Sequence, residues 1–364
     1  SFFRALVDPR DKKQAEILVD YSLKVKKGEN VVIQGEYSAK PLMFEIYKLL
    51  VKRGAGEVKV RFEPYEFGEY FLKNASMEQI KHFPQTVMDE TKKMDCYIRI
   101  GSEANTRAYA SIDSKRVSER LKVLRPITDY RVENTRWVVT RFPTEAQAQE
   151  ADMSLADYED FLFNSINKPD WKKKFKEQEK LRKLIDKTKV VRIVGEDTDL
   201  VLGKKGRNSE SDYGTHNMPG GEVFTSVEED KADGHIKFTY PAIYMGREYV
   251  DVRLEFKKGK VVKATASKGE KELNDILSMD EGAKRIGELG IGNNFEIDRF
   301  TKSILFDEKI GGTIHLALGK GYKETGSKNI SALHWDMIKD LRRGGELWFD
   351  DKLVQKEGKW LIKL

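Results

Sequence analysis

The sequence predicts two domains: an α/β N-terminal domain with a parallel sheet at residues 1–188, and an α+β C-terminal domain, mainly antiparallel β, at residues 189–364. The chain has 364 residues, which is long for a single hydrophobic core. In its first half, short apolar runs alternate with stretches of helical periodicity, a pattern typical of βαβ units. Its second half has short β-branched runs with polar alternation, which is typical of antiparallel strands.

The N-terminal domain begins with a predicted βαβ unit. Residues 31–33 form a short apolar run, apolar residues recur at helical spacing over residues 42–50, and apolar and charged residues alternate over residues 58–62. Further apolar strand candidates follow at residues 96–101 and 136–142. Because strands joined through helices pair in parallel, we expect one parallel sheet with helical cover.

The loop after the first strand does not resemble a nucleotide-binding loop. Residues 35–41 lack the Gly-x-Gly-x-x-Gly pattern that lets backbone amides approach a pyrophosphate. We therefore interpret the N-terminal domain as a scaffold or substrate-gating domain.

Two capping boxes predict helix starts ahead of the second domain. Thr144 with Gln147, and Ser154 with Asp157, have the three-residue spacing of such boxes. A charged helix with a narrow apolar stripe is expected within residues 168–189, joining the two domains. Its lysines are candidates for phosphate contacts, but a solvated helix face is the preferred interpretation.

The second domain is predicted to be mainly antiparallel β. Strand-like segments with β-branched residues occur at residues 190–202, 235–240, 249–266 and 311–319. Gly259 stands where a hairpin would turn within the third of these segments.

The composition excludes several classes of protein. The net charge of +6 is spread over interleaved acids and bases, so no nucleic-acid partner is required. No run of eighteen apolar residues occurs, and the first residues have no signal-peptide core, so we expect no membrane association. Cys96 is the single cysteine, which excludes an intramolecular disulfide and a cysteine zinc cage. We expect a buried thiol and a cytoplasmic location.

A histidine and an aspartate flank a tryptophan near the C-terminus. If the segment is a strand, His334 and Asp336 point to the same side and Trp335 points to the other, into packing. An imidazole and a carboxylate that meet at one point suit a metal ion. The motif alone also fits an ordinary hydrogen-bonded pair.

Other isolated polar groups of the second domain lie in apolar or glycine-rich surroundings. Glu222 follows a Pro-Gly-Gly turn, and Glu288 lies in the glycine-rich segment 286–292. His315 shares its strand face with small residues, and Tyr322 follows it by seven residues after a glycine-bounded turn. Taken singly, the histidine could be a hydrogen-bonded core residue, and the glutamates could cap amides or form surface ion pairs.

Together these residues predict a metal site in the second domain. Glu222, Glu288, His315, His334 and Asp336 make three carboxylates and two imidazoles. Mixed Glu/Asp/His ligation suits zinc, manganese or cobalt, and five ligands suit two ions better than one.

Several longer motifs occur in the order found in one known family. They are PRDKKQAEILVDYSLKVKKGENVVIQGE, FPTEAQAQEADMSLADYEDFLF, GTHNMPGGEVFTS, GTIHLALGKGY and NISALHWDMIKDL. In these motifs the chain closely resembles the thermophilic aminopeptidase family of dinuclear metallopeptidases, which includes aminopeptidases T and S. The resemblance covers nearly the whole chain.

The resemblance implies a metallo-aminopeptidase that removes N-terminal residues from peptides by attack of a water bridging two divalent metal ions. The metal ligands of the family match Glu222, Glu288, His315, His334 and Asp336. Its catalytic tyrosine matches Tyr322, which would donate a hydrogen bond to the tetrahedral oxyanion or assist protonation. The family also implies a homodimer.

Two alternatives accompany this hypothesis, and one role within it stays open. Either Glu222 or Glu288 is a candidate for the general base. A non-catalytic peptide- or metal-binding protein on the same scaffold is the first alternative. A nucleic-acid-binding protein is the second, but it is suggested only by the positive charge and by the basic stretch WKKKFKEQEKLRK, without a platform of aromatic and basic residues.

Overall fold

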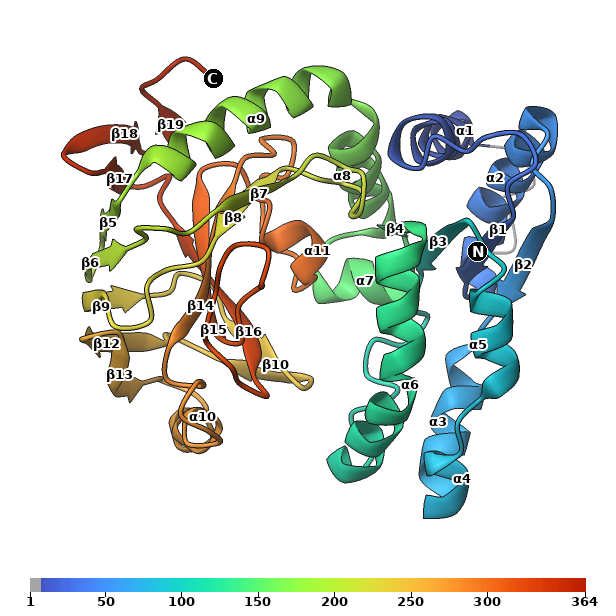
Figure 1. Ribbon diagram of the computed structural model, residues 1–364, viewed down its shortest axis with the longest axis horizontal. Helices are drawn as coiled ribbons and strands as arrows, with labels where there is room; N and C mark the ends of the chain where they lie inside the picture. The colour runs from blue at the N-terminus through green and yellow to red at the C-terminus, as the bar shows by residue number, and fades with distance from the viewer. Residues whose placement is uncertain (1–7) are drawn as a thin grey trace. The chain divides into compact units, whose positions relative to one another are not determined.

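A computed structural model describes residues 8–364, which form two compact units (Figure 1). The N-terminal unit comprises residues 8–169 and 214–219, and the C-terminal unit comprises residues 170–213 and 220–364. The division therefore falls at Asp170, not at the predicted boundary between residues 188 and 189. The charged helix α9 (Trp171–Lys187) belongs to the C-terminal unit because it packs on strands of that unit.

The short segment 214–219 is part of the N-terminal unit through backbone pairing with one strand. The Val139 amide donates to the carbonyl of His216 at 2.8 Å, and the Met218 amide donates to the carbonyl of Val139 at 2.8 Å. The ring of His216 lies 4.7 Å from the ring of Trp137. Sequence reasoning placed this segment in the second domain.

The N-terminal unit is built on a four-stranded parallel sheet, as predicted. Its order is β2 (Val58–Phe62), β1 (Val31–Gly35), β3 (Cys96–Gly101) and β4 (Arg136–Arg141). β1 pairs with β2 on one side and with β3 on the other, so the chain changes direction across the sheet between β1 and β3. Because the strands are parallel, their carboxyl ends all lie at the same end of the sheet.

Helices complete the N-terminal unit, and their starts follow the predicted caps. The Thr144 hydroxyl accepts from the Gln147 amide at 3.2 Å, and the Ser154 hydroxyl accepts from the Asp157 amide at 3.1 Å. Cys96 is buried, as expected. The helices are α1 (Pro9–Glu16), α2 (Lys40–Arg53), α3 (Tyr65–Asn74), α4 (Met77–Lys81), α5 (Gln85–Thr91), α6 (Ser114–Asn134), α7 (Glu145–Glu150) and α8 (Leu155–Asn167), with short π and 3₁₀ turns at Ile17–Ser22 and Tyr37–Ala39.

The C-terminal unit contains two large antiparallel sheets, which confirms the predicted fold class. The first has the order β13 (Lys260–Thr265), β12 (Arg253–Lys257), β9 (Ala232–Lys237), β6 (Thr198–Gly203), β5 (Val190–Gly195), β17 (Glu346–Phe349), β18 (Lys352–Lys356) and β19 (Lys359–Trp360). The second has the order β16 (His334–Asp340), β15 (Thr313–Gly319), β14 (Ile286–Gly292), β8 (Glu222–Thr225) and β7 (Ser209–Asp212). A small hairpin, β10 (Ala242–Tyr244) with β11 (Arg247–Tyr249), and the helices α10 (Glu270–Leu277) and α11 (Ile304–Asp307) complete the unit. Gly259 turns the hairpin between β12 and β13 with φ +78°, as predicted.

The hydrophobic core of the C-terminal unit draws on both sheets. Alternate residues of β15 enter it, including Leu316, together with Leu200 of β6 and Leu254 of β12. Trp335 of β16 packs edge-on against the ring of Tyr249 at 4.8 Å. One face of the five-stranded sheet is therefore packed against the core, and the opposite face of the sheet is left for polar side chains. Helix α9 runs along β7 and β8 (Figure 1).

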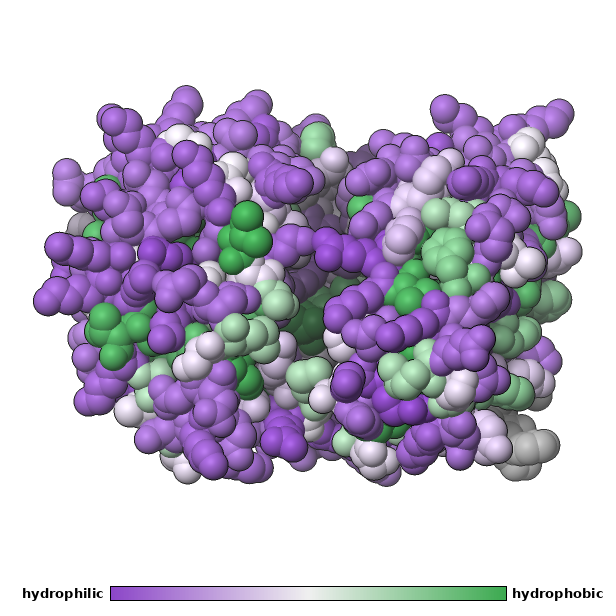
Figure 2. Space-filling view, turned by 60° about the horizontal axis from the view of Figure 1, so that its bottom comes forward, coloured by the Kyte–Doolittle hydropathy of each residue, from purple (hydrophilic) through white to green (hydrophobic). Residues whose placement is uncertain are grey.

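The surface agrees with the high content of charged residues, 35% of the chain. On the face drawn in Figure 2, hydrophobic residues form small separate patches within a largely hydrophilic surface. Within residues 8–364, no helix combines the length and the hydrophobicity needed to cross a membrane.

Candidate metal centre

Four neighbouring strands of the five-stranded sheet bring the five predicted ligands together. Glu222 begins β8, Glu288 lies in β14, His315 lies in β15, and His334 and Asp336 lie in β16. Because residues two apart on a strand share a face, the predicted geometry of His334 and Asp336 is confirmed: their facing atoms, Nε2 and Oδ2, are 3.5 Å apart.

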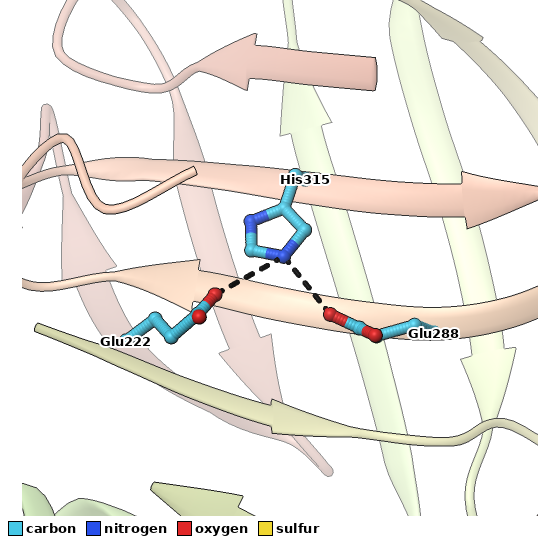
Figure 3. Close-up of side chains that lie close together, drawn as sticks. All are labelled: Glu222, Glu288 and His315. Atoms are coloured by element: carbon cyan, nitrogen blue, oxygen red, sulfur yellow. Dashed lines mark hydrogen bonds and ion pairs between the residues drawn. The ribbon is translucent and has the colours of Figure 1, made fainter. Parts of the chain in front are cut away.

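The inner part of the cluster is a buried histidine between two glutamates (Figure 3). His315 Nε2 lies 3.1 Å from Glu288 Oε1 and 3.4 Å from Glu222 Oε2. One ligand atom from each of these three residues lies within 4.8 Å of the others. His315 is completely buried, and the side chains of both glutamates are about 7% exposed.

The outer part of the cluster is more open to solvent. His334 Nε2 lies 3.9 Å from Glu288 Oε2, which connects the pair on β16 to the buried residues. His334 Nδ1 lies 2.7 Å from the carbonyl of Lys320, so this nitrogen carries the proton and Nε2 is directed to the carboxylates. The side chain of His334 is 31% exposed. A continuous series of contacts therefore joins all five residues, with its accessible end at β16.

Small residues opposite the ligands make room for the cluster. His315 pairs in register with Gly290, and a Cβ on Gly290 would lie 2.0 Å from the imidazole ring. Ala317 pairs with Glu288 on one side and with Asp336 on the other. The room in front of His315 is thus provided by a glycine of the neighbouring strand.

Tyr322 lies at the accessible end of the cluster. Its ring centroid is 5.5 Å from the ring of His334 and 5.5 Å from the ring of Phe224. Burial and the nearby carboxylates, Glu288 first among them, raise the pKa of the phenol, so the hydroxyl is protonated at neutral pH. Its position makes it a hydrogen-bond donor at the rim of the cluster.

Sequence reasoning missed a buried lysine beside the ligands. Lys309 Nζ lies 3.4 Å from Glu222 Oε1 and 3.8 Å from Asp212 Oδ2, and it also contacts Glu308. Lys309 is completely buried. The segment FDEKIGG has the charge pattern of an exposed loop, so its sequence gives no signal of this role.

Burial and the charges within the cluster shift the pKa values of all five residues. Burial opposes protonation of the histidines, but hydrogen bonds and carboxylate charges outweigh it and raise the pKa of His315 to about 10 and that of His334 to about 9. Burial raises the pKa of Glu222 and of Glu288, against the effect of their cationic neighbours. For Asp336, the hydrogen bond and charge of His334 overcome burial and lower the pKa.

The cluster has the donor set and the unsatisfied atoms that suit divalent cations. Glu288 Oε2 and Asp336 Oδ1 are buried and have no hydrogen-bond partner within residues 8–364. A buried carboxylate oxygen without a donor is costly unless a cation neutralises it. Nitrogen and oxygen ligands in this ratio fit zinc, cobalt or manganese.

Comparisons with known proteins agree with this chemistry. The sequence profile of the thermophilic metalloprotease family (M29) matches residues 7–360. Aminopeptidase 2 of Geobacillus stearothermophilus is 26% identical, with 85% of this chain and 83% of that protein covered, and aminopeptidase AmpS of Bacillus subtilis is 25% identical with the same coverage. The structure of wild-type AmpT from Thermus thermophilus shares the fold, with a TM-score of 0.85 at 19% identity over 97% of this chain and 99% of that one.

Proposed function

This chain belongs to the M29 family of thermophilic metalloproteases, and on that premise we propose that it is a metal-dependent aminopeptidase that releases N-terminal residues from peptides. The observation that carries the proposal is the convergence of two histidines and three carboxylates from four adjacent strands on one face of a sheet. A structural ion-pair network needs no accessible edge, whereas this cluster has one at His334.

We assign the five side chains as ligands of two divalent ions. Glu222, Glu288 and His315 would hold the buried side of the site, and His334 and Asp336 would hold the accessible side. Glu288 contacts both histidines through its two oxygens, so it connects the buried side and the accessible side of the site. When bound, such ions polarise a peptide carbonyl and lower the pKa of a water molecule.

The protein side chains supply the remaining steps. One of the two glutamates, Glu222 or Glu288, would accept the proton of the attacking water. The Tyr322 hydroxyl would donate a hydrogen bond to the oxyanion that develops on the substrate carbonyl. Lys309 would hold Glu222 in place and balance part of the negative charge of the cluster. The Lys320 carbonyl would fix the orientation of His334.

A chelator experiment tests the proposal. Aminoacyl p-nitroanilides should be hydrolysed by the protein, hydrolysis should stop after chelation, and zinc, cobalt or manganese should restore it. A free amino terminus should be required, so an N-acetylated peptide should be cleaved far more slowly than its unmodified twin. Full activity in protein shown by elemental analysis to be metal-free would remove the metallopeptidase assignment. Metal binding without hydrolysis would favour a non-catalytic peptide- or metal-binding protein instead.

Two further assignments accompany the function. We expect a homodimer, on the resemblance to the aminopeptidase family, and light scattering at micromolar concentration should then give twice the chain mass of 41.9 kDa. We expect a cytoplasmic location, because the single cysteine is buried as a free thiol. In this assignment the N-terminal unit is the scaffold or gating domain and the C-terminal unit is the catalytic domain.

A further inference from the structure

The N-terminal unit contains a cavity at the carboxyl ends of its parallel strands. The cavity has a volume of about 580 Å³. It is lined by residues that directly follow three strands: Glu36 after β1, Glu63 after β2, and Ser102 and Glu103 after β3. It therefore opens where the chain changes direction between β1 and β3, the position at which parallel α/β sheets bind small ligands.

Two of the carboxylates in this cavity are already engaged. Glu103 pairs with Arg141 and accepts from Gln147 at 2.8 Å, and these contacts together lower its pKa despite burial. Glu63 accepts a hydrogen bond from Gln34. Neither carboxylate is therefore available to neutralise a ligand without losing a partner.

One acid and one base in the cavity are not neutralised. Within residues 8–364, the Glu36 side chain accepts a hydrogen bond from the Ala104 amide at 3.3 Å and has no ion pair, and the Arg99 side chain has neither an ion pair nor a hydrogen bond. Gln34 pairs in register with Arg99, and the chain stays extended at Glu36, so Glu36 and Arg99 lie on the same face of the sheet. The cavity thus presents one unpaired anion and one unpaired cation from adjacent strands.

A buried hydroxyl and several aromatic rings complete the lining. Ser102 is 1% exposed, and its hydroxyl has no hydrogen-bond partner within the described chain. An unsatisfied buried hydroxyl is costly, so a polar ligand atom in the cavity would stabilise it. Rings of Phe62, Phe67 and Tyr109 also line the cavity, and each is at least 40% exposed. Apolar rings held in water beside a cavity favour a ligand with an apolar part.

We propose that this cavity binds a free α-amino acid with an apolar or aromatic side chain. The carboxylate of Glu36 holds the ammonium group, the guanidinium of Arg99 holds the carboxylate, and the Ser102 hydroxyl adds a hydrogen bond. The rings of Phe62, Phe67 and Tyr109 contact the side chain. An α-amino acid carries an ammonium group and a carboxylate on the same carbon, which matches an acid and a base on adjacent strands.

Other small ligands fit these residues less well. A nucleotide would place phosphates among three carboxylates, and the loop after β1 lacks the glycine pattern of a phosphate cradle. A simple organic cation would leave Arg99 without a partner. The inference does not depend on the peptidase assignment, although that reaction would release molecules of the same class.

Calorimetric titration of the full-length protein tests the proposal. L-phenylalanine and L-leucine should bind, whereas N-acetylphenylalanine and phenylalaninamide should each bind at least about tenfold more weakly, because each lacks one charge. Glu36→Gln and Arg99→Gln should each weaken phenylalanine binding by a similar factor. Glu57→Gln, which removes an exposed carboxylate of the same unit outside the cavity, is the matched control and should leave binding unchanged.

A metal-centre variant separates the two sites. His334→Ala should keep the titration in the cavity intact, even though it disrupts the metal site. Loss of binding in His334→Ala, with normal binding in Glu36→Gln and Arg99→Gln, would place the amino acid at the metal centre and overturn the proposal. Equal binding of phenylalaninamide would also overturn it, because the cavity would then recognise only a cation. If no free amino acid binds to the protein, the proposal is also overturned. Hydrolysis assays test the peptidase assignment separately and do not depend on that outcome.

Discussion

The ammonium group of Lys309 lies 3.4 Å from Glu222 Oε1, and both side chains are buried in the C-terminal unit. The same ammonium group contacts Glu308 and lies 3.8 Å from Asp212. Burial lowers the pKa of Lys309, but the charges of these carboxylates outweigh it and keep the lysine protonated. One cation thus balances three carboxylates, and one of these, Glu222, is a candidate metal ligand.

Lys309→Met should destabilise the protein and weaken metal binding. The substitution preserves most of the side-chain volume but leaves buried carboxylates without their cation, which costs about 3–5 kcal/mol. Urea unfolding of metal-free protein measures the first effect, and metal analysis after dialysis measures the second. Lys260→Met, at an exposed ion pair, is the control and should change stability by less than about 1 kcal/mol. Normal stability together with normal metal content would show that Lys309 has no role in the site.

Gly290→Ala should displace His315 and reduce metal content. The added methyl group would lie 2.0 Å from the imidazole ring, a distance that the buried ring cannot accommodate without moving. Gly195→Ala offers a comparison at another strand glycine, where the new Cβ would lie 3.3 Å from the flexible end of Lys339. Elemental analysis and thermal unfolding should show a large loss in the first variant and a small one in the second. Full metal loading of Gly290→Ala would contradict the proposed position of His315.

Tyr322→Phe should lower kcat without loss of metal. The change removes only the hydroxyl, which is protonated at neutral pH and lies beside His334 at the accessible end of the cluster. Loss of one oxyanion donor typically lowers the rate by about a hundredfold or more. Steady-state kinetics and metal stoichiometry should be measured on the same preparation. A kcat close to that of the unmodified protein would mean that Tyr322 only packs against Phe224 and His334.

Metal affinity should rise with pH from about 7 to 9. In metal-free protein His315 and His334 have pKa values of about 10 and about 9, so both carry a proton at pH 7. Each must release that proton before its nitrogen binds a cation, so the apparent affinity should increase about tenfold per pH unit for each proton released. The increase should level off as the pH passes each pKa. Calorimetry in buffers of different ionisation enthalpy measures the number of protons released when the metal binds. If no proton is released at pH 7, both histidines are excluded as ligands.

Local patterns predicted much of the fold because they depend on neighbouring residues. The alternation in β16 placed Trp335 in the core and His334 beside Asp336, and this geometry is confirmed. The hydroxyls of Thr144 and Ser154 cap helices that begin where the sequence predicted them. The contact between His334 and Asp336 and both helix caps lie within a few residues along the chain.

Contacts between distant segments explain what the sequence did not reveal. Lys309 reaches Glu222 and Asp212 across about ninety residues, and nothing in the segment FDEKIGG distinguishes this lysine from a solvated one. Helix α9 was expected to join the domains, but Gln178 donates to the carbonyl of Glu222 at 2.8 Å, so the helix belongs to the C-terminal unit. Residue types and their surroundings suggested the five ligands, and the family resemblance supported the set, but spacing along the chain does not specify which strands are neighbours.

The segment 214–219 has a consequence for how this protein can be divided or recombined. The main chain leaves the N-terminal unit after residue 169, returns to it for six residues, and leaves again just before Glu222. A fragment that starts at Asp170 would contain the segment 214–219 but not Val139, with which that segment pairs. A fragment that ends at residue 169 would contain Val139 but not its partner segment. Neither unit is one continuous stretch of sequence, so gene fusions and domain swaps with this chain must exchange two separate stretches of sequence together.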